Sequence, residues 1–290
     1  MDKQSVFTAL QDSYSTAALT KGADRVSVGH AGLNTALGGG LLCQRVHLVT
    51  NPQTSSYNQE LDNNALGAKS AIGQSGAGFG QMPTAFTLSL IALLQAKHKG
   101  PIVWCGPVRS GLAGHLFGAG LAEMGLSPAQ FIFVRESHPL RRMAAFEEAL
   151  ATHGLSAVVN EYGPLYEKPA LWQKSARRLQ LACARGTATA FMVGTGGAAA
   201  GFETAWQVAP ASQPCQITTD WRPAWQVTLT HARSGYPAAA TLLWDKESGR
   251  LLPAQPLMDQ GASSDDWVPD NWKSHPYRTD IVTPIWRKTG

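Results

Sequence analysis

Five short apolar runs, separated by longer helix-like segments, dominate the first part of the chain. The runs are RVHLVT (45–50), PIVWC (101–105), FIFV (131–134), LSAVV (155–159) and ATAFMV (188–193). Strands buried on both faces of a parallel sheet need such continuous apolar runs, because helices cover the sheet above and below. A spacing of roughly 25–30 residues is typical of right-handed βαβ units. The pattern therefore predicts an α/β domain.

Helix-like segments lie between these runs, at about 83–98, 110–124, 139–153 and 170–185. In the first of them Pro83 suits the first turn, where its missing N–H has no intrahelical partner anyway. Apolar residues surround most of this helix, so we expect a buried element rather than an amphipathic one. Lys97, His98 and Lys99 suit its carboxyl-terminal end, and Gly100 suits the position just beyond it.

The sequence changes character after residue 205. TAWQVAP and RPAWQVTLTHARSGYPAAATLLWD contain alternating, β-branched and aromatic positions, which we interpret as an antiparallel extension of the same sheet. The predicted organisation is a helical segment at 1–24, a core domain at 25–252 and a carboxyl-terminal tail at 253–290. Within the core, the polar and glycine-rich residues 51–80 predict a long loop.

The tail is rich in proline, serine and aspartate but also carries spaced aromatic residues. Such residues indicate either that the tail packs back on the domain or that it docks on a partner. The candidate partner-binding residues are Trp267, Trp272, Tyr277 and Trp286.

Composition and cysteine placement bear on the cellular compartment of the protein. The net charge of +4 is only mildly basic, and the amino-terminal segment lacks a secretory pattern. The longest apolar run, AFTLSLIALL, is about half of the ~20 residues that a membrane span needs. The four cysteines are far apart and three sit in or beside apolar stretches, which favours reduced thiols in a cytoplasmic protein without membrane contact. No histidine spacing typical of zinc sites occurs, so no metal or other cofactor is predicted.

The stretch GQSGAGFG (73–80) invites comparison with a phosphate-binding P-loop. In that motif, G-x-x-x-x-G-K-[ST], backbone N–H groups hold the phosphates, lysine neutralises them and the hydroxyl binds magnesium. With Gly73 and Gly78 as the two glycines, Phe79 and Gly80 stand where the lysine and the hydroxyl residue belong. This reading frame does not make a working nucleotide site.

A second reading frame supplies Lys69 and Ser70, but Asn63 and Ala68 replace its two glycines. More glycine-rich sequence follows it instead of a helix. A flexible glycine loop before a core helix is therefore the interpretation that we favour over a functional P-loop.

GQSGA (73–77) approaches the nucleophile elbow of hydrolases, G-x-S-x-G, with Ser75 as the candidate nucleophile and Ala77 in the last place. That elbow requires a strand directly before the serine. The preceding NNALGAKSAI is a poor strand, and His231 is the one histidine suited to the partner role. Loss of fluorophosphonate labelling in Ser75→Ala would be needed to support a hydrolase.

Glu161 follows the run LSAVV, at the position where α/β NTPases place a magnesium-binding carboxylate. Carboxylates commonly follow strands, however, and without a P-loop lysine there is no phosphate for the magnesium to bridge. A surface carboxylate is the simpler interpretation.

Basic residues share the helix predicted at 170–185, namely Lys174, Arg177, Arg178 and Arg185. They are candidate DNA-backbone contacts, and Arg141 and Arg142 at the start of another helix could add to them. The same spacing is the default for the solvated face of an amphipathic helix, which remains the alternative.

The stretch VSVGHAGLNTALGGGLLCQRVHLVT (26–50) resembles the segment that leads into the first ATPase strand of the RecA core. The residues in register with that family pattern are Gly29, Leu33, Asn34, Leu37, Gly38, Gly40, Leu41 and Arg45. The resemblance implies a RecA-like core, with a mostly parallel sheet flanked by helices and with antiparallel carboxyl-terminal strands.

Further segments make the chain similar to the ImuA family, RecA-like accessory proteins of bacterial mutagenesis cassettes. They are GPIVWCGP, GLSPAQFIFV, EEAL…GLSAVVNE, SARRLQLACARGTATAFMV, AWQVAP and W-x-V-x-L-x-x-x-R-x-G-x-P before WD. Their order and spacing agree with the family from about residue 25 to 245.

This resemblance implies a non-catalytic adaptor in damage-induced (SOS) translesion synthesis. The implied partners are an ImuB-type relative of Y-family polymerases, bound through the carboxyl-terminal region, and an error-prone C-family polymerase. RecA is a further candidate partner, and contact with DNA can be indirect.

Two departures from RecA bear on catalysis. PIVWCGPVRSG (101–111) offers no counterpart of the glutamate that follows the second core strand, and the P-loop lysine is missing. Phosphoryl transfer needs charge neutralisation and a positioned water, so we expect negligible hydrolysis. The alternative is a RecA-type ATPase or recombinase that binds nucleotide through a degenerate P-loop with Lys69 and Ser70.

Overall fold

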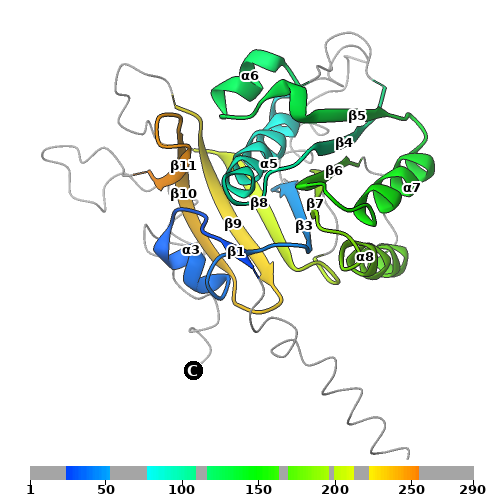
Figure 1. The fold of residues 1–290 in the computed structure, drawn as a ribbon. Helices are drawn as coiled ribbons and strands as arrows, with labels where there is room; N and C mark the ends of the chain where they lie inside the picture. Colours follow the sequence, from blue (N-terminus) through cyan, green and yellow to red (C-terminus); the bar gives the residue numbers. More distant parts are fainter. Residues whose placement is uncertain are drawn as a thin grey trace, which may run out of the picture.

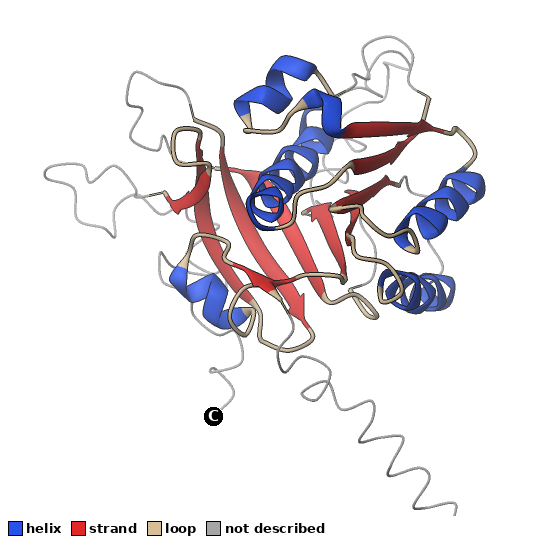
Figure 2. Cartoon of the chain, in the orientation of Figure 1, coloured by secondary structure: helices blue, strands red, loops and turns tan. Residues whose placement is uncertain are grey.

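The computed structural model describes residues 24–52, 77–108, 116–162, 169–195, 199–211 and 222–254. Nine strands in these residues form one sheet in the order β11-β10-β9-β8-β3-β7-β6-β4-β5 (Figures 1 and 2). Their bounds are β3 Val46–Asn51, β4 Ile102–Gly106, β5 Phe131–Arg135, β6 Ala157–Glu161, β7 Thr189–Thr195, β8 Thr204–Pro210, β9 Ala224–Ala232, β10 Ala238–Asp245 and β11 Arg250–Pro253. A separate hairpin-like pair joins β1 (Arg25–Val26) to β2 (Leu41–Leu42).

Helices cover both faces of the parallel strands (Figure 1). α5 (Ala77–Lys97) and α6 (Gly118–Glu123) lie on one face, and α7 (Pro139–Leu150) and α8 (Pro169–Cys183) lie on the other. The short helix α3 (Ala31–Ala36) covers β10, and a 3₁₀ turn, η2 (Pro128–Gln130), precedes β5. This arrangement confirms the predicted α/β, RecA-like architecture with its five apolar runs as parallel strands.

Alternate residues of each strand supply two separate hydrophobic cores. Val159 of β6 faces the α5 side, whereas Val158 faces α7 and α8. On the α5 side, Phe86 packs against Trp206 and Trp225, with ring centroids 5.8 and 5.9 Å apart. Aromatic side chains of this size bury large apolar areas, so Phe86 fixes α5 over the junction between β8 and β9.

β8 corrects the prediction of an antiparallel extension. It pairs parallel with β3 and antiparallel with β9, and only β9, β10 and β11 continue the sheet in the antiparallel sense. The alternating pattern of TAWQVAP indicates a strand, but alternation carries no information on strand direction.

Two further expectations need correction. α5 begins at Ala77, so Pro83 lies inside the helix instead of in its first turn, and residues that we assigned to the 51–80 loop belong to the helix. β5 is one of the two edge strands of the described sheet, and Ile132 and Phe133 are 51% and 40% exposed. The run FIFV therefore is not buried on both faces, and no strand among the described residues pairs with its outer margin.

Candidate functional site

The carboxyl ends of the parallel strands meet at one edge of the sheet, which we call the carboxyl edge. β3 ends there at Asn51, β4 at Gly106, β6 at Glu161 and β7 at Thr195. Ligands of open α/β sheets bind at this edge. The connecting residues 53–76, 109–115, 163–168 and 196–198 lie outside the described residues, so the strand ends define the candidate site.

Glu161 occupies the strand end predicted for it. Its Oε1 accepts a hydrogen bond of 2.8 Å from the indole Nε1 of Trp104, which is buried in β4. A Cβ placed on Gly106 would lie 3.4 Å from Oε2, so the carboxylate lies against the end of β4. The sequence located this carboxylate, but it gave no sign that an indole from a neighbouring strand orients it.

Arg142 is a component of this edge that the sequence analysis misassigned to a basic surface. Its side chain is buried, and it donates from Nε to the Glu161 carbonyl at 2.9 Å and from Nη1 to the Glu136 carbonyl at 2.7 Å. Arg141 is exposed. Helical spacing could have predicted this burial, because Arg142 lies on the same face of α7 as the core residues Phe146 and Leu150.

Close packing continues beside Glu161. A Cβ on Gly194 of β7 would lie 2.5 Å from the Tyr162 carbonyl oxygen, so the chain passes too closely for any larger residue. Burial raises the pKa of the Tyr162 hydroxyl well above its usual value. Among the described residues, the side-chain oxygens Oδ1 of Asn51 and Asn160 are buried without a hydrogen-bond partner. These two acceptors lie on strands that end at the candidate site.

The basic residues of α8 are exposed, as both of their interpretations require. Lys174, Arg177, Arg178 and Arg185 lie on the outer face of the helix or just beyond its end. Arg178 forms an ion pair with Glu147 of α7 at 2.6 Å, and Leu181 among them is 57% exposed. The structure brings the four residues onto one face without deciding between solvent and DNA.

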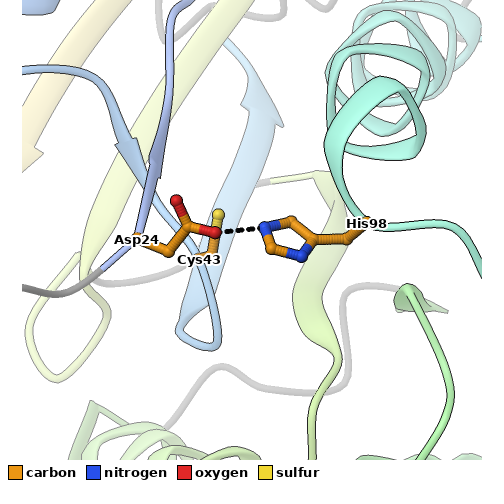
Figure 3. A group of neighbouring side chains, drawn as sticks. All are labelled: Asp24, Cys43 and His98. Carbon is orange, nitrogen blue, oxygen red and sulfur yellow. Dashed lines mark ion pairs between the residues drawn. The ribbon is translucent and has the colours of Figure 1, made fainter.

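A second group of polar side chains lies at the opposite, amino edge of the parallel strands (Figure 3). It consists of Asp24, Cys43 and His98, whose ligand atoms all lie within 4.8 Å of one another. The Asp24 carboxylate contacts both His98 Nε2 and Lys97 Nζ. Burial raises the pKa of Cys43 to about 11, partly offset by a hydrogen bond with Thr189 and by the charge of Arg25.

Two curated relatives resemble this chain, both of them Protein ImuA from Caulobacter vibrioides, in two strains. Each is 31% identical to it over 200 residues, a stretch that covers 64% of this chain and 77% of the relative. The chain belongs to the ImuA family. No family model matches it.

Membership in the ImuA family confirms the resemblance and supports involvement in SOS mutagenesis and translesion synthesis. The P-loop-like residues Lys69, Ser70 and Gly73 and the candidate nucleophile Ser75 lie outside the described residues, as does Cys215. The other three cysteines are buried free thiols. Among the described helices, none combines the length and the apolarity that a membrane crossing demands.

The aromatic residues expected to bind the ImuB-type partner, Trp267, Trp272, Tyr277 and Trp286, also lie outside the described residues. So does the helical segment predicted within 1–24, apart from Asp24. The described residues of this ImuA-family protein begin at Asp24 and end at Ala254.

Proposed function

We propose that this ImuA-family protein is a non-catalytic, RecA-like adaptor in damage-induced translesion DNA synthesis. It would act with an ImuB-type homologue of Y-family polymerases and an error-prone C-family polymerase, with RecA as a further partner. The observation that carries this proposal is the junction between β3 and α5, where the fold keeps a strand and a helix but the sequence lacks the phosphate-binding cation.

α5 begins at Ala77, so Gly78, Phe79 and Gly80 form its first turn. A P-loop places its lysine and its magnesium-binding hydroxyl at the start of the equivalent helix. The sequence of α5 contains no basic residue before Lys97, at its far end. Without a cation beside the phosphates, the charge that develops during phosphoryl transfer is not neutralised. This supports a scaffold role in place of ATP hydrolysis.

Two charged side chains at the carboxyl edge, Glu161 and Arg142, have internal partners. Trp104 orients the Glu161 carboxylate through a neutral N–H donor, and Arg142 donates to two backbone carbonyls. These contacts stabilise the strand ends. They support an architecture that persists as a platform for other proteins.

The partner test uses the natural end of the core. β11 ends at Pro253, and the backbone N–H of Ala254 donates to the Thr241 carbonyl at 2.9 Å. A chain truncated after Ala254 keeps this last hydrogen bond. We expect it to retain the thermal unfolding transition of the full chain but to lose capture of the ImuB-type protein in a pull-down from damage-treated cells.

Single alanine substitutions at Trp267, Trp272, Tyr277 and Trp286 refine the test, because buried aromatic anchors often contribute ~2 kcal/mol or more to an interface. The matched control is Phe117→Ala, since Phe117 is an aromatic residue outside the tail whose side chain is 76% exposed. Unfolding of the truncated chain would show that the tail is a core element and contradict docking through it. Undiminished capture of the ImuB-type protein by the truncated chain would also contradict docking through the tail.

A nucleotide-binding ATPase is the alternative that a second experiment separates from the adaptor. A site using Lys69 and Ser70 should raise stability by ~2–3 kcal/mol at a hundredfold excess of ATP–magnesium over its dissociation constant. We expect no change in the unfolding midpoint and no ATP turnover above that of Lys69→Ala. Turnover that disappears in Lys69→Ala would overturn the adaptor proposal.

A further inference from the structure

Backbone hydrogen bonds hold Asp24 and Cys43 opposite each other. β1 and β2 pair with Arg25 across from Leu42, and the N–H of Cys43 donates to the Asp24 carbonyl at 2.9 Å. The two residues are therefore cross-strand neighbours at the end of the β1–β2 pair. Their side chains are brought together by main-chain pairing, which does not depend on the charge of either group.

His98 comes from a different segment. It directly follows the last residue of α5, and its N–H donates to the Leu94 carbonyl at 2.7 Å. Lys97 Nζ also donates to the Arg25 carbonyl at 3.1 Å, which fixes the end of α5 against β1. Figure 3 shows the imidazole pointing at the Asp24 carboxylate, with the Cys43 sulfur beside it.

Of the three side chains, one is buried and two are partly exposed to solvent. Cys43 is 6% exposed, whereas the side chains of Asp24 and His98 are 35% and 39% exposed. His98 Nε2 nevertheless is a buried atom without a hydrogen-bond partner among the described residues. Its close contact with Asp24 is an ion pair by distance but not a hydrogen bond by geometry. Both observations place the Nε2 nitrogen in the middle of the cluster, next to the Asp24 carboxylate.

We infer that Asp24, Cys43 and His98 form a binding site for a zinc-class transition-metal ion. The three side chains offer a sulfur, an imidazole nitrogen and a carboxylate oxygen. These are the kinds of ligand atom that bind Zn²⁺ in proteins, at metal–ligand distances of about 2.3, 2.0 and 2.1 Å. Tetrahedral coordination at these lengths separates neighbouring donors by about 3.5 Å. The donor atoms already lie within 4.8 Å of one another, so small side-chain rotations bring them to this geometry.

The donor set mixes sulfur, nitrogen and oxygen, which argues against Ca²⁺ and Mg²⁺ as the bound ion. Ca²⁺ and Mg²⁺ prefer oxygen ligands alone. The half-exposed position leaves the fourth coordination place to water. The ion replaces the thiol proton of Cys43, which passes to solvent as the S–metal bond forms. The site would tie the β1–β2 pair to the end of α5, as a staple at the amino edge that is independent of the adaptor role.

Lys97 is the internal competitor for the site. Its ammonium contacts the Asp24 carboxylate and would stand close to a bound dication. Lys97→Met should therefore tighten metal binding about tenfold, the order expected when a unit charge beside a divalent ion is removed in a well-hydrated setting. A substitution that merely disturbed the fold would weaken binding instead.

Cobalt(II) titration of the metal-stripped full chain tests the inference, because Co²⁺ reports its ligands by colour. We expect a thiolate-to-cobalt charge-transfer band and intense visible bands of four-coordinate cobalt, both displaced by one equivalent of zinc. Zinc should also raise the thermal unfolding midpoint by several degrees. Cys43→Ala should remove the charge-transfer band, and Cys183→Ala, which changes a distant buried thiol, should keep it.

His98→Gln and Asp24→Asn cover the case in which Cys43→Ala fails to fold, since both positions are partly exposed. Each should weaken cobalt binding by more than about 100-fold, because even residues that only support a ligand are worth 10–100-fold. His153→Gln, at an exposed histidine, is the control. Absence of the charge-transfer band in the wild type, or its survival in Cys43→Ala, would overturn the site.

Discussion

The carboxyl and amino edges of the same parallel strands differ in how their polar groups are used. At the carboxyl edge, Glu161 and Arg142 are engaged with Trp104 and with backbone carbonyls. At the amino edge, three metal-binding donor atoms converge from segments that are far apart in the sequence. At the edge where this fold ordinarily holds a ligand, these two charged side chains are thus stabilised from within, although Asn51 and Asn160 each keep a buried oxygen without a partner among the described residues. The group of metal-ligand types lies at the other edge.

This difference shows two ways in which a sequence can encode a site. The P-loop is a local pattern, so substitutions at a few consecutive positions remove it. The Asp24–Cys43–His98 cluster has no local pattern, because β1–β2 pairing and the length of α5 create it. The following predictions probe the two edges, beginning with the largest expected effect.

His47, near the amino end of β3, should make the protein sensitive to acid. It is fully buried between Leu42 and Thr204, and burial lowers its pKa to about 4. The unfolded chain binds a proton near pH 6.5, so stability is complete above that pH and falls as pH drops toward 4. The loss should reach about 3 kcal/mol. Urea unfolding from pH 7 to 4 measures it.

His47→Gln should flatten this pH dependence even if it lowers stability at every pH. His153→Gln should leave the profile of the wild type unchanged. An identical slope between pH 6.5 and 4 in His47→Gln would refute the assignment.

Arg142→Ala should cost about 2–3 kcal/mol of unfolding free energy, because it leaves the Glu161 and Glu136 carbonyls without their buried donor. Its neighbour Arg141 is exposed, and Arg141→Ala should change stability by less than about 0.5 kcal/mol. Denaturant midpoints of the two variants measure the difference. Equal effects would mean that Arg142 does not stabilise the carboxyl edge.

Trp104→Phe should cost about 1–2 kcal/mol, through the lost hydrogen bond to the Glu161 carboxylate. A double-mutant cycle with Glu161→Gln isolates that contact from the change in packing. We expect a coupling energy of about 1 kcal/mol. Additive effects would show that the indole does not orient the carboxylate.

The smallest effect is expected at α8, away from both edges. Arg178→Ala removes an exposed ion pair with Glu147 and should change stability by less than about 1 kcal/mol. If the basic face contacts DNA, each substitution at Lys174, Arg177, Arg178 or Arg185 should lower the salt dependence of DNA binding by about one unit of slope. Unchanged salt dependence would support the solvated face.

The sequence predicted β3, β4, β5, β6 and β7 as parallel strands because each is a continuous apolar run, the pattern of doubly covered sheets. β8 pairs parallel with β3 but has an alternating pattern, so its direction was predicted wrongly. The exposure of Ile132 and Phe133 could not be predicted, since the position of β5 at the margin depends on strand order. Pro83 was misplaced for a different reason. A proline suits a first turn, but here the helix extends toward the glycines, and Pro83 lies within it.

The candidate site was predictable only in part. Glu161 was found because it directly follows an apolar run, whereas its indole partner lies on another strand that the sequence does not align with it. Arg142 looked like a surface residue until its carbonyl partners were known. The absence of zinc-type histidine spacing predicted no metal site, and it did not reveal the cluster of Asp24, Cys43 and His98, because such spacing describes only ligands that share one helix or loop.

The outer margin of β5 has a consequence for how the chain behaves in concentrated solution. Ile132 and Phe133 are exposed there, and the guanidinium carbon of Arg135 lies 5.9 Å from the centre of the Phe133 ring. A positively charged side chain on an edge strand disfavours the edge-to-edge pairing by which exposed edge strands aggregate. The Arg135 charge would therefore oppose self-association along this edge of the described sheet.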